Sequence, residues 1–416
     1  MGINAIRGFN DILPGEIEKW QFFENTARNI FEAFGFSEIR VPILEKTELF
    51  VRGIGEATDI VEKEMFTFPD RHGELMTMRP EGTAPVVRAF IEHSMHAADS
   101  VTKLYYTGPM FRYERPQKGR YRQFYQIGAE IFGVESSIAD AEILSMLTEL
   151  FNRTGIKGAE LQINSLGCKE CRPTYKGLLL DFLTTKREML CPDCQRRLNH
   201  NPLRVLDCKN EGCREATKDA PSIIDNLCEG CASHFNEVKS NLDILGTRYS
   251  INPRMVRGLD YYQKTTFEIV CTSLGSQNAV AAGGRYDGLV EELGGPETPG
   301  LGFAIGLERA VSLIDLPNSS FIKKPALFIA TIGEQARKWA LKTKCDLNIK
   351  GVWAEMDYEG KSIKSQMRRA DKLGARFAVV IGDNEISSGS AMLKDMGAHS
   401  DEEVTLSSIS AKVSTR

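Results

Sequence analysis

The chain has no long apolar run. Nowhere in its 416 residues do roughly 20 apolar side chains follow one another, as a membrane-spanning helix requires. The N-terminal stretch MGINAIRGFNDILP contains no apolar core of a secretory signal. Ile6 occupies the position at which N-myristoylation needs Ser or Thr. These absences argue against insertion into a membrane, secretion and N-myristoylation. We expect a cytoplasmic protein with no membrane partner.

A strong charge of one sign is also missing. Lys and Arg total 52 against 56 Asp and Glu, a formal net charge of −4. The composition therefore gives no global sign of a polyanionic partner, although a local basic face remains compatible with one. We find no internal repeat or low-complexity tract. The length predicts two or three domains of a globular protein.

Cysteine, by contrast, is abundant and concentrated. Eight of the ten cysteines fall within residues 168–231, mostly as C-x-x-C pairs. In a reducing compartment this pattern indicates metal rather than disulfides. The spacing predicts one four-thiolate zinc site from Cys168, Cys171, Cys191 and Cys194, and a second from Cys208, Cys213, Cys228 and Cys231. Such sites would be structural. The alternative is a helical insertion whose reduced cysteines hold no metal.

Periodicity and turn residues predict the order of elements. Residues 16–34 have the apolar spacing of a helix, and residues 36–50 read as a strand interrupted by Pro42. Two β-rich runs, at 104–114 and 123–133, flank a polar turn and predict an antiparallel hairpin. Further along we expect a helix at 139–153, strands at 265–271 and 278–282, a Gly-rich strand passing into a helix at 300–314, a linker at 319–325, and then a β-α-β-α-β pattern with a small parallel sheet.

The loop of this hairpin is basic. Arg112 ends the first strand, and Lys118, Arg120 and Arg122 follow within the turn. Guanidiniums on a rigid hairpin suit phosphate oxygens, because Arg binds them bidentately and stays charged. The plainer alternative is a solvated basic turn.

The returning strand carries a second polar pattern. Gln126 and Glu130 are an even number of residues apart, so they face the same side of the strand and suggest a lined pocket. Phe124 is placed either to stack on a nucleobase or to pack in the core.

Two other stretches are ambiguous when taken alone. Glu81 and Thr83 lie in a turn that opens a helix, where they either grip an ammonium group or cap the helix. In residues 300–311 glycines stand where a strand meets a helix. They would let a flat ring lie against the backbone, while Arg309 reaches phosphate from the helix. Close packing is the commoner reason for such glycines.

The order of these motifs resembles a known class of enzyme. FRYE at 111–114 in a hairpin, followed by a strand and helix ending GLER at 306–309, resembles the second and third signature motifs of class II aminoacyl-tRNA synthetases. The strand with Pro42 resembles the first motif, which forms the dimer interface in that class. RGLDYY at 257–262, GGRYDGL at 283–289 and RGFNDILP at 7–14 resemble the histidyl-tRNA synthetase family.

This resemblance, which runs from residue 7 to about 395, implies a fold. We expect an α+β catalytic core of the class II type with an antiparallel sheet, formed by residues 1–167 and 246–318. A helical Cys-rich insertion would occupy residues 168–245, and a C-terminal α/β anticodon-binding domain residues 325–416. The resemblance does not support the zinc, which rests on spacing alone, and it assigns no role to the last twenty residues.

The resemblance also implies an activity. It is the ATP-dependent attachment of L-histidine to tRNA(His) through a histidyl-adenylate, with release of AMP and diphosphate, in a homodimer that uses Mg²⁺ with ATP. Arg257 and Arg112 would be catalytic. By resemblance the histidine site comprises Glu81, Gly82, Thr83, Arg112, Gln126, Glu130, Arg257, Tyr261, Tyr262 and Tyr286, and the ATP site Arg112, Glu114, Arg120, Phe124 and Arg309.

Two rival interpretations remain open. One is a catalytically inactive relative, a histidine-sensing regulatory subunit of the first enzyme of histidine biosynthesis. Such proteins resemble the synthetase core but usually lack the anticodon domain and several ATP-binding residues, all of which this chain has. The other is a zinc-dependent nucleic-acid-binding protein without chemistry, which would leave the RGLDYY motif unexplained.

Overall fold

The computed structural model describes residues 2–55, 58–117, 119–275 and 278–414, and Lys118 of the predicted basic loop lies outside them. Contacts between Cα atoms divide the chain into two compact units, residues 1–318 and residues 319–416. Among the described residues, no helix is long and apolar enough to cross a membrane.

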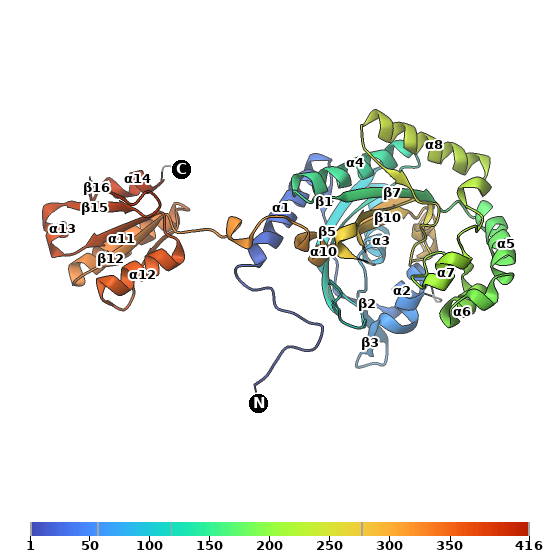
Figure 1. Cartoon of the computed structure of the whole chain (residues 1–416), viewed down its shortest axis with the longest axis horizontal. Helices are drawn as coiled ribbons and strands as arrows, with labels where there is room; N and C mark the ends of the chain where they lie inside the picture. The colour runs from blue at the N-terminus through green and yellow to red at the C-terminus, as the bar shows by residue number, and fades with distance from the viewer. Residues whose placement is uncertain (1, 56–57, 118, 276–277, 415–416) are drawn as a thin grey trace. The chain divides into compact units, whose positions relative to one another are not determined.

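The first unit is built on an eight-stranded sheet (Figure 1). Its strands, in spatial order, are β1 (Ser37–Glu38), β5 (Thr102–Phe111), β6 (Gln123–Phe132), β11 (Gly300–Gly306), β10 (Ala279–Arg285), β9 (Gln263–Cys271), β7 (Ala159–Ser165) and β8 (Ser250–Ile251). The six central strands pair antiparallel, and only the short edge strands β1 and β8 pair parallel. The predicted hairpin is confirmed, since β5 and β6 pair from Thr102↔Phe132 to Phe111↔Gln123.

Helices complete this core. They are α1 (Ile17–Ala33), α2 (Thr47–Ile54), α3 (Thr83–Glu92), α4 (Ser137–Arg153), α9 (Leu289–Glu292) and α10 (Leu307–Ser312). α1 buries Trp20, Phe23, Ala27 and Ile30, which recur at helical spacing. The Ser136 hydroxyl accepts a hydrogen bond from the Ile138 N–H, 3.3 Å away, which caps α4.

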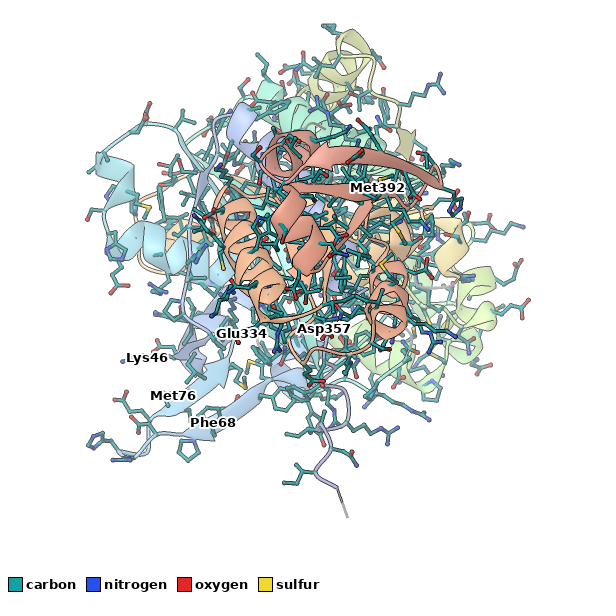
Figure 2. All side chains as sticks on the ribbon, turned by 90° about the vertical axis from the view of Figure 1, so that its left-hand side faces the viewer. Lys46, Phe68, Met76, Glu334, Asp357 and Met392 are labelled. Atoms are coloured by element: carbon teal, nitrogen blue, oxygen red, sulfur yellow. The ribbon has the colours of Figure 1, made fainter. Side chains whose placement is uncertain are left out.

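A separate three-stranded sheet carries the first motif. β2 (Leu44–Lys46) and β3 (Phe66–Pro69) both pair antiparallel with β4 (Leu75–Met78), and Figure 2 shows Phe68, Met76 and Lys46 on these strands. The predicted strand over 36–50 is therefore only partly right. Pro42 does break it into two short strands, but residues 47–50 begin α2.

The insertion leaves the sheet after β7 and returns before β8. Its helices are α5 (Cys171–Thr184), α6 (Pro192–His200), α7 (Glu211–Ala216) and α8 (Glu229–Ile244). α8 packs along α4 of the core, as Figure 1 shows. Side chains of the insertion such as Tyr175 and Leu179 share one hydrophobic core with Tyr261, Tyr262 and Tyr286, so the insertion is not an independent body.

The second unit is a five-stranded sheet with helices. It comprises β12 (Leu327–Thr331), α11 (Glu334–Ile349), β13 (Ala354–Met356), α12 (Ile363–Leu373), β14 (Phe377–Ile381), α13 (Asp383–Ser388), β15 (Ser390–Asp395), β16 (Ser400–Thr405) and α14 (Ile409–Ser414), with strand order β13-β12-β14-β15-β16. The predicted parallel pattern is found in β13, β12 and β14. The antiparallel hairpin β15–β16 extends it, and Ile409 and Val413 of α14 enter the same core. The last twenty residues, to which the sequence assigned no role, thus form part of this unit.

Candidate active site and cysteine clusters

A cavity of about 240 Å³ lies on the eight-stranded sheet of the first unit. Most of the site residues expected from the sequence line it. They are Glu81, Thr83, Arg112, Glu114, Arg120, Phe124, Gln126, Arg257, Tyr261, Tyr262 and Arg309. Gly82, Glu130 and Tyr286 do not line this cavity. The fold therefore gathers into one place side chains from stretches scattered between residues 81 and 309.

Glu81 and Thr83 lie where α3 begins. The Glu81 carboxylate accepts hydrogen bonds from the N–H groups of Thr83 (2.7 Å) and Ala84 (2.8 Å), so Glu81 rather than Thr83 caps the helix. Burial raises the pKa of Glu81, and the two N–H donors oppose that rise. The Thr83 hydroxyl donates to Glu130 Oε1 at 2.8 Å. The turn therefore both caps α3, through Glu81, and forms part of the cavity wall.

Glu130 is fully buried behind this wall. Its Oε2 accepts a hydrogen bond of 2.6 Å from the Tyr286 hydroxyl, while Oε1 accepts from Thr83. Burial raises the pKa of Glu130 to about 8, against the lowering effect of these hydroxyls. Gly302 stands opposite Glu130 on β11, where a Cβ would lie 1.6 Å from Oε2. The carboxyl group therefore needs glycine at this position.

Two other residues predicted to bind histidine differ in position: Gln126 lines the cavity, and Gly82 does not. A Cβ at Gly82 would lie 2.2 Å from the ring of Tyr106, so glycine here permits a close approach of that ring. The Oε1 of Gln126 is buried, and it has no hydrogen-bond partner among the described residues. A buried acceptor of this kind is satisfied by a ligand donor or by water.

The cavity is cationic at the end predicted to hold ATP. Arg120 Nη1 lies 2.9 Å from Glu114 Oε2. The Arg112 Nε donates to the Pro80 carbonyl at 2.8 Å, and its guanidinium lies 5.3 Å from the centroid of the Phe124 ring. Burial, together with the neighbouring cations Arg120 and Arg112, lowers the pKa of Arg309. Three guanidiniums so close together favour an anion between them.

Arg257 approaches the cavity from the RGLDYY segment. It forms an ion pair with Glu268 of β9, and its guanidinium lies 5.5 Å from the centroid of the Tyr262 ring. Burial alone would lower the pKa of Arg257, but Glu268 together with Tyr262, Tyr261 and Asp207 outweighs it and the pKa is raised. The cation is therefore permanent and held in place from one side.

Sequence reasoning missed two carboxylates at this site. Glu268 stands as a single charged residue in the otherwise apolar end of β9, and that isolation was the available signal. Glu308, from the GLER motif itself, lines the cavity and accepts from the Tyr125 N–H at 3.0 Å. Burial raises the pKa of Glu308 to about 7.

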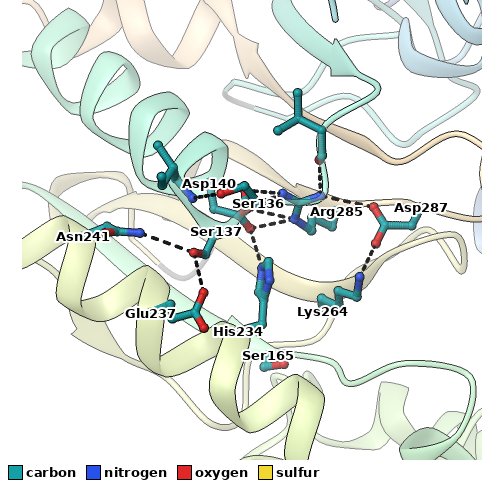
Figure 3. A network of polar contacts seen from close by, with 12 residues as sticks. Ser136, Ser137, Asp140, Ser165, His234, Glu237, Asn241, Lys264, Arg285 and Asp287 are labelled. Atoms are coloured by element: carbon teal, nitrogen blue, oxygen red, sulfur yellow. Dashed lines mark hydrogen bonds and ion pairs between the residues drawn. The ribbon is translucent and has the colours of Figure 1, made fainter. Parts of the chain in front are cut away.

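A second polar network lies behind the pocket, between the core and the insertion (Figure 3). Arg285 and Asp140 are both fully buried, and Arg285 Nε donates to Asp140 Oδ2 at 2.8 Å. His234 of α8 completes this contact, with Nε2 lying 3.4 Å from Asp140 Oδ1. Asp287, two residues beyond Arg285, pairs with Lys264 Nζ at 2.8 Å. The network fixes the chain on both sides of Tyr286.

The eight insertion cysteines form two groups of four, but not the two that spacing predicted. The outer cluster comprises Cys168, Cys171, Cys228 and Cys231, and the inner cluster Cys191, Cys194, Cys208 and Cys213. The expected pairing of 168–171 with 191–194 is thus wrong. Linear spacing favours neighbouring pairs, whereas helices α5 and α8 bring the two ends of the insertion together.

Both clusters have the geometry of thiolate metal sites. Within each, the sulfur atoms all lie within 4.8 Å of one another. Sγ–Sγ distances are 3.7 Å for Cys168–Cys171, 3.8 Å for Cys168–Cys228 and 3.9 Å for Cys191–Cys208. A tetrahedral ion with sulfur ligands at about 2.3 Å spaces its ligands about 3.8 Å apart. The Cys171 Sγ also accepts a hydrogen bond from the Cys168 N–H at 3.1 Å.

The antiparallel sheet, with FRYE ending β5 and GLER joining β11 to α10 around a cavity of arginines, defines the first unit as the catalytic domain of a class II aminoacyl-tRNA synthetase. A family model described as histidyl-tRNA synthetase matches residues 8–310, and one described as an anticodon binding domain matches residues 326–416. The chain belongs to the histidyl-tRNA synthetase family.

Individual relatives agree over nearly the whole length. The chain is 58% identical over 404 residues to a protein of Geobacter sulfurreducens named histidine–tRNA ligase, with 97% of each chain covered. A protein of the same name from Syntrophotalea carbinolica is 57% identical over 409 residues, covering 98% of this chain and 97% of that one. Among solved structures, apo histidyl-tRNA synthetase of S. aureus matches with a TM-score of 0.83 and 37% identity, covering 99% of this chain and 100% of that one.

Proposed function

We propose that the protein attaches L-histidine to tRNA(His) in two steps, first forming a histidyl-adenylate from ATP and then transferring histidine to the tRNA, with release of AMP and diphosphate. One observation carries this proposal. A single cavity joins a wall of tyrosines and buried polar groups to a cluster of guanidiniums, so an amino acid and a nucleotide would meet there. Names of relatives at 57–58% identity support it.

In this proposal the two catalytic cations act on the α-phosphate. Arg257, held by Glu268, and Arg112, held by the Pro80 carbonyl, would face the negative charge that develops as the histidine carboxylate attacks phosphorus. Fixed donors aimed at developing charge lower the barrier because they need no reorganisation during the reaction. Arg112 would also orient the attacking carboxylate.

The remaining residues would select and orient the substrates. Tyr262 and Glu130 would pair with the imidazole, Tyr261 and Tyr286 would shape its surroundings, and Glu81, Thr83 and Gln126 would hold the α-amino group beside Gly82. A neutral imidazole has one donor and one acceptor, so polar partners reject side chains that would leave them unpaired. Glu114 and Phe124 would contact adenine, with Arg120 and Arg309 on the phosphates.

Mg²⁺ would enter with ATP. The carboxylates of Glu114 and Glu308 line the cavity, and Mg²⁺ is commonly held by one or two carboxylates together with substrate phosphates. When bound, the ion neutralises phosphate charge. Burial raises the pKa of Glu308 to about 7. A bound cation would lower this pKa again by favouring the ionised carboxylate, which is the form that binds Mg²⁺.

Residues 325–416, within the second unit, would bind the anticodon arm. Lys364, Arg368 and Lys372 recur every four residues on α12 and are exposed, so they form one basic stripe that suits a phosphate backbone. The core would comprise residues 1–167 and 246–318, and residues 168–245 the insertion. Matches to the family models at 8–310 and 326–416 support the division between the synthetase part and the anticodon-binding unit.

A homodimer is part of the proposal. The three-stranded sheet that carries the first motif exposes Leu44, Phe68 and Leu75, at 42%, 40% and 54% of their surface, and Figure 2 shows Phe68 on it. An apolar patch of this kind suits a subunit interface. We also propose a cytoplasmic location, because free thiolates and tRNA substrates occur together there.

Each cysteine cluster would hold one structural Zn²⁺. The sulfur spacing supports tetrahedral coordination with no ligand position left for substrate. Elemental analysis of protein purified without added metal should give close to two zinc ions per chain. Fewer than about a tenth of an ion, with all eight thiols titrating as free, would contradict this part of the proposal.

The decisive experiment is histidine-dependent exchange of labelled diphosphate into ATP, followed by charging of tRNA(His). We expect both activities, with no exchange when other amino acids replace histidine. A regulatory subunit that only senses histidine would bind it without exchange, and a nucleic-acid-binding protein would do neither. Absence of exchange from folded, zinc-loaded protein would overturn the proposed function.

A further inference from the structure

The outer cysteine cluster lies at the neck of the insertion, where the chain leaves and rejoins the core. Cys168 precedes α5 and Cys171 begins it, and Cys228 and Cys231 open α8, 60 residues further on. An ion at this cluster would therefore hold the first turns of α5 and α8 at a fixed distance from each other. On each of these helices a side chain near the cluster contacts residues that surround the histidine pocket.

On α5 that side chain is Arg172, which directly follows Cys171. Its Nη2 donates a hydrogen bond to the backbone carbonyl of Tyr262, the second tyrosine of RGLDYY. The backbone beside the cluster makes a parallel contact, because the Lys264 N–H donates to the Gly167 carbonyl at 2.9 Å and the Leu166 N–H donates to the Lys264 carbonyl at 2.7 Å. The backbone at Tyr262 and at Lys264, two residues beyond it, is thus tied to residues that flank the cluster.

On α8 the side chain is His234, one turn beyond Cys231. Through Asp140 it contacts Arg285, whose next residue is Tyr286 (Figure 3). Arg285 is held further by the carbonyls of Val134 at 2.8 Å and Ser136 at 2.9 Å. Tyr286 in turn donates to Glu130. Through His234 and Asp140, α8 is therefore linked to Arg285, the residue that precedes Tyr286.

We propose that the outer cluster positions the histidine pocket from behind, with Arg172 and His234 as positioning residues for Tyr262 and Tyr286. The insertion then serves the first, amino-acid-activating step. This inference rests on the proposed function, since it concerns the same site. Neither residue lines the cavity. Arg172 acts through Tyr262, which lines it, and His234 acts through Tyr286, which holds Glu130 and through it Thr83 of the cavity wall.

The sequence alone leads to a different expectation. An insertion with structural zinc, remote from the substrates, should influence tRNA charging and leave histidine activation nearly unchanged on chelation. The shared core of Tyr175 and Leu179 with Tyr261, Tyr262 and Tyr286, together with the Arg172 contact, argues that histidine binding should respond as well. ATP binding should respond less, because Arg112 and Arg120 contact Pro80 and Glu114, which lie outside the insertion.

The first test compares Arg172→Ala with Arg196→Ala in the diphosphate exchange assay. Arg196 lies on α6 of the same insertion and is 70% exposed in an ion pair with Asp193, so its loss controls for general effects of removing an arginine. We expect Arg172→Ala to raise the KM for histidine about tenfold, with the KM for ATP within about twofold, since a lost hydrogen bond to a partly buried carbonyl is felt locally. Arg172→Lys, which keeps one donor, should recover much of the loss.

Parallel increases in both KM values, or a histidine KM for Arg172→Ala no higher than that of Arg196→Ala, would overturn the proposal. A wild-type protein without histidine-dependent exchange would overturn the proposed function instead, so the two failures are distinguishable.

The second test needs no catalysis. Calorimetric titration of L-histidine into zinc-loaded protein, chelated protein and chelated protein resupplied with Zn²⁺ measures the Kd directly. We expect chelation to weaken histidine binding at least fivefold and Zn²⁺ alone to restore it. His234→Ala should weaken binding in the same direction, whereas Ser233→Ala, on the exposed side of α8, should not. An unchanged Kd in protein verified to be free of metal would overturn the proposal.

Discussion

Glu130 is a carboxyl group whose environment opposes its ionisation. Burial raises its pKa to about 8 from a usual value of 4.5. Between these two values the unfolded chain releases the proton while the folded chain keeps it. The group therefore opposes folding increasingly as pH rises from about 4.5 to about 8, by about 3 kcal/mol at pH 7.

Glu130→Gln should remove this opposition while keeping the size of the side chain. We expect the variant to gain thermal stability relative to wild type as pH rises from 5 to 8, measured by the unfolding midpoint without substrates. Glu149→Gln, an exposed residue of α4, is the control and should show no such trend. A constant difference between wild type and Glu130→Gln across this range would show that Glu130 is ionised in the folded apo protein.

Arg257 is a second single residue with a testable role, and its expected effect is on catalysis rather than on stability. Its replacement by Ala should slow single-turnover adenylate formation by at least a hundredfold, because loss of one fixed contact to developing charge costs about 3–4 kcal/mol. Glu268→Gln leaves the guanidinium in place and should have a smaller effect. Adenylation by Arg257→Ala at a rate near that of wild type would remove it from the catalytic step.

At the scale of single elements, β11 has a strict requirement for glycine at one position and a loose one at another. A Cβ at Gly302 would lie 1.6 Å from Glu130 Oε2 and 2.7 Å from the Ala129 carbonyl, whereas at Gly306 the nearest atom is 3.9 Å away. Gly302→Ala should therefore lower the free energy of unfolding by about 1–3 kcal/mol, with Gly306→Ala close to wild type. Equal unfolding midpoints for the two variants would contradict this geometry.

Most of the helices and strands were predicted from the sequence, and the predictions that were wrong have local structural causes. The hairpin of β5 and β6, the helix α4 and the passage from β11 to α10 were all expected, because period and turn residues mark them. Residues 47–50 were taken as strand, although they begin α2. Thr47 and Phe50 favour strands, but Leu49 and Phe50 also suit a buried helix face. The cysteine pairing failed because it depends on how α5 and α8 fold back, which spacing along the chain does not contain. Glu268 escaped notice because its role is visible only beside Arg257.

The scale of the whole molecule concerns the division of labour between its two units. All residues lining the cavity belong to the first unit, residues 1–318, and the basic stripe of α12 belongs to the second. Protein lacking residues 319–416 should therefore keep histidine-dependent diphosphate exchange within a few-fold of wild type and lose efficient charging of tRNA(His). Losing both activities equally would mean that the first unit needs the second in order to fold or to associate.

The neck of the insertion has a consequence for how the chain reaches its native state. β7 and β9 are neighbours in the sheet, with Ser165 opposite Thr265, although the whole insertion separates them in the sequence. Closing so long a loop is a slow, entropically unfavourable event for a flexible chain. An ion that joined Cys168 and Cys171 to Cys228 and Cys231 would shorten the path between the two strands by more than half and so lower the entropic cost of closing the sheet.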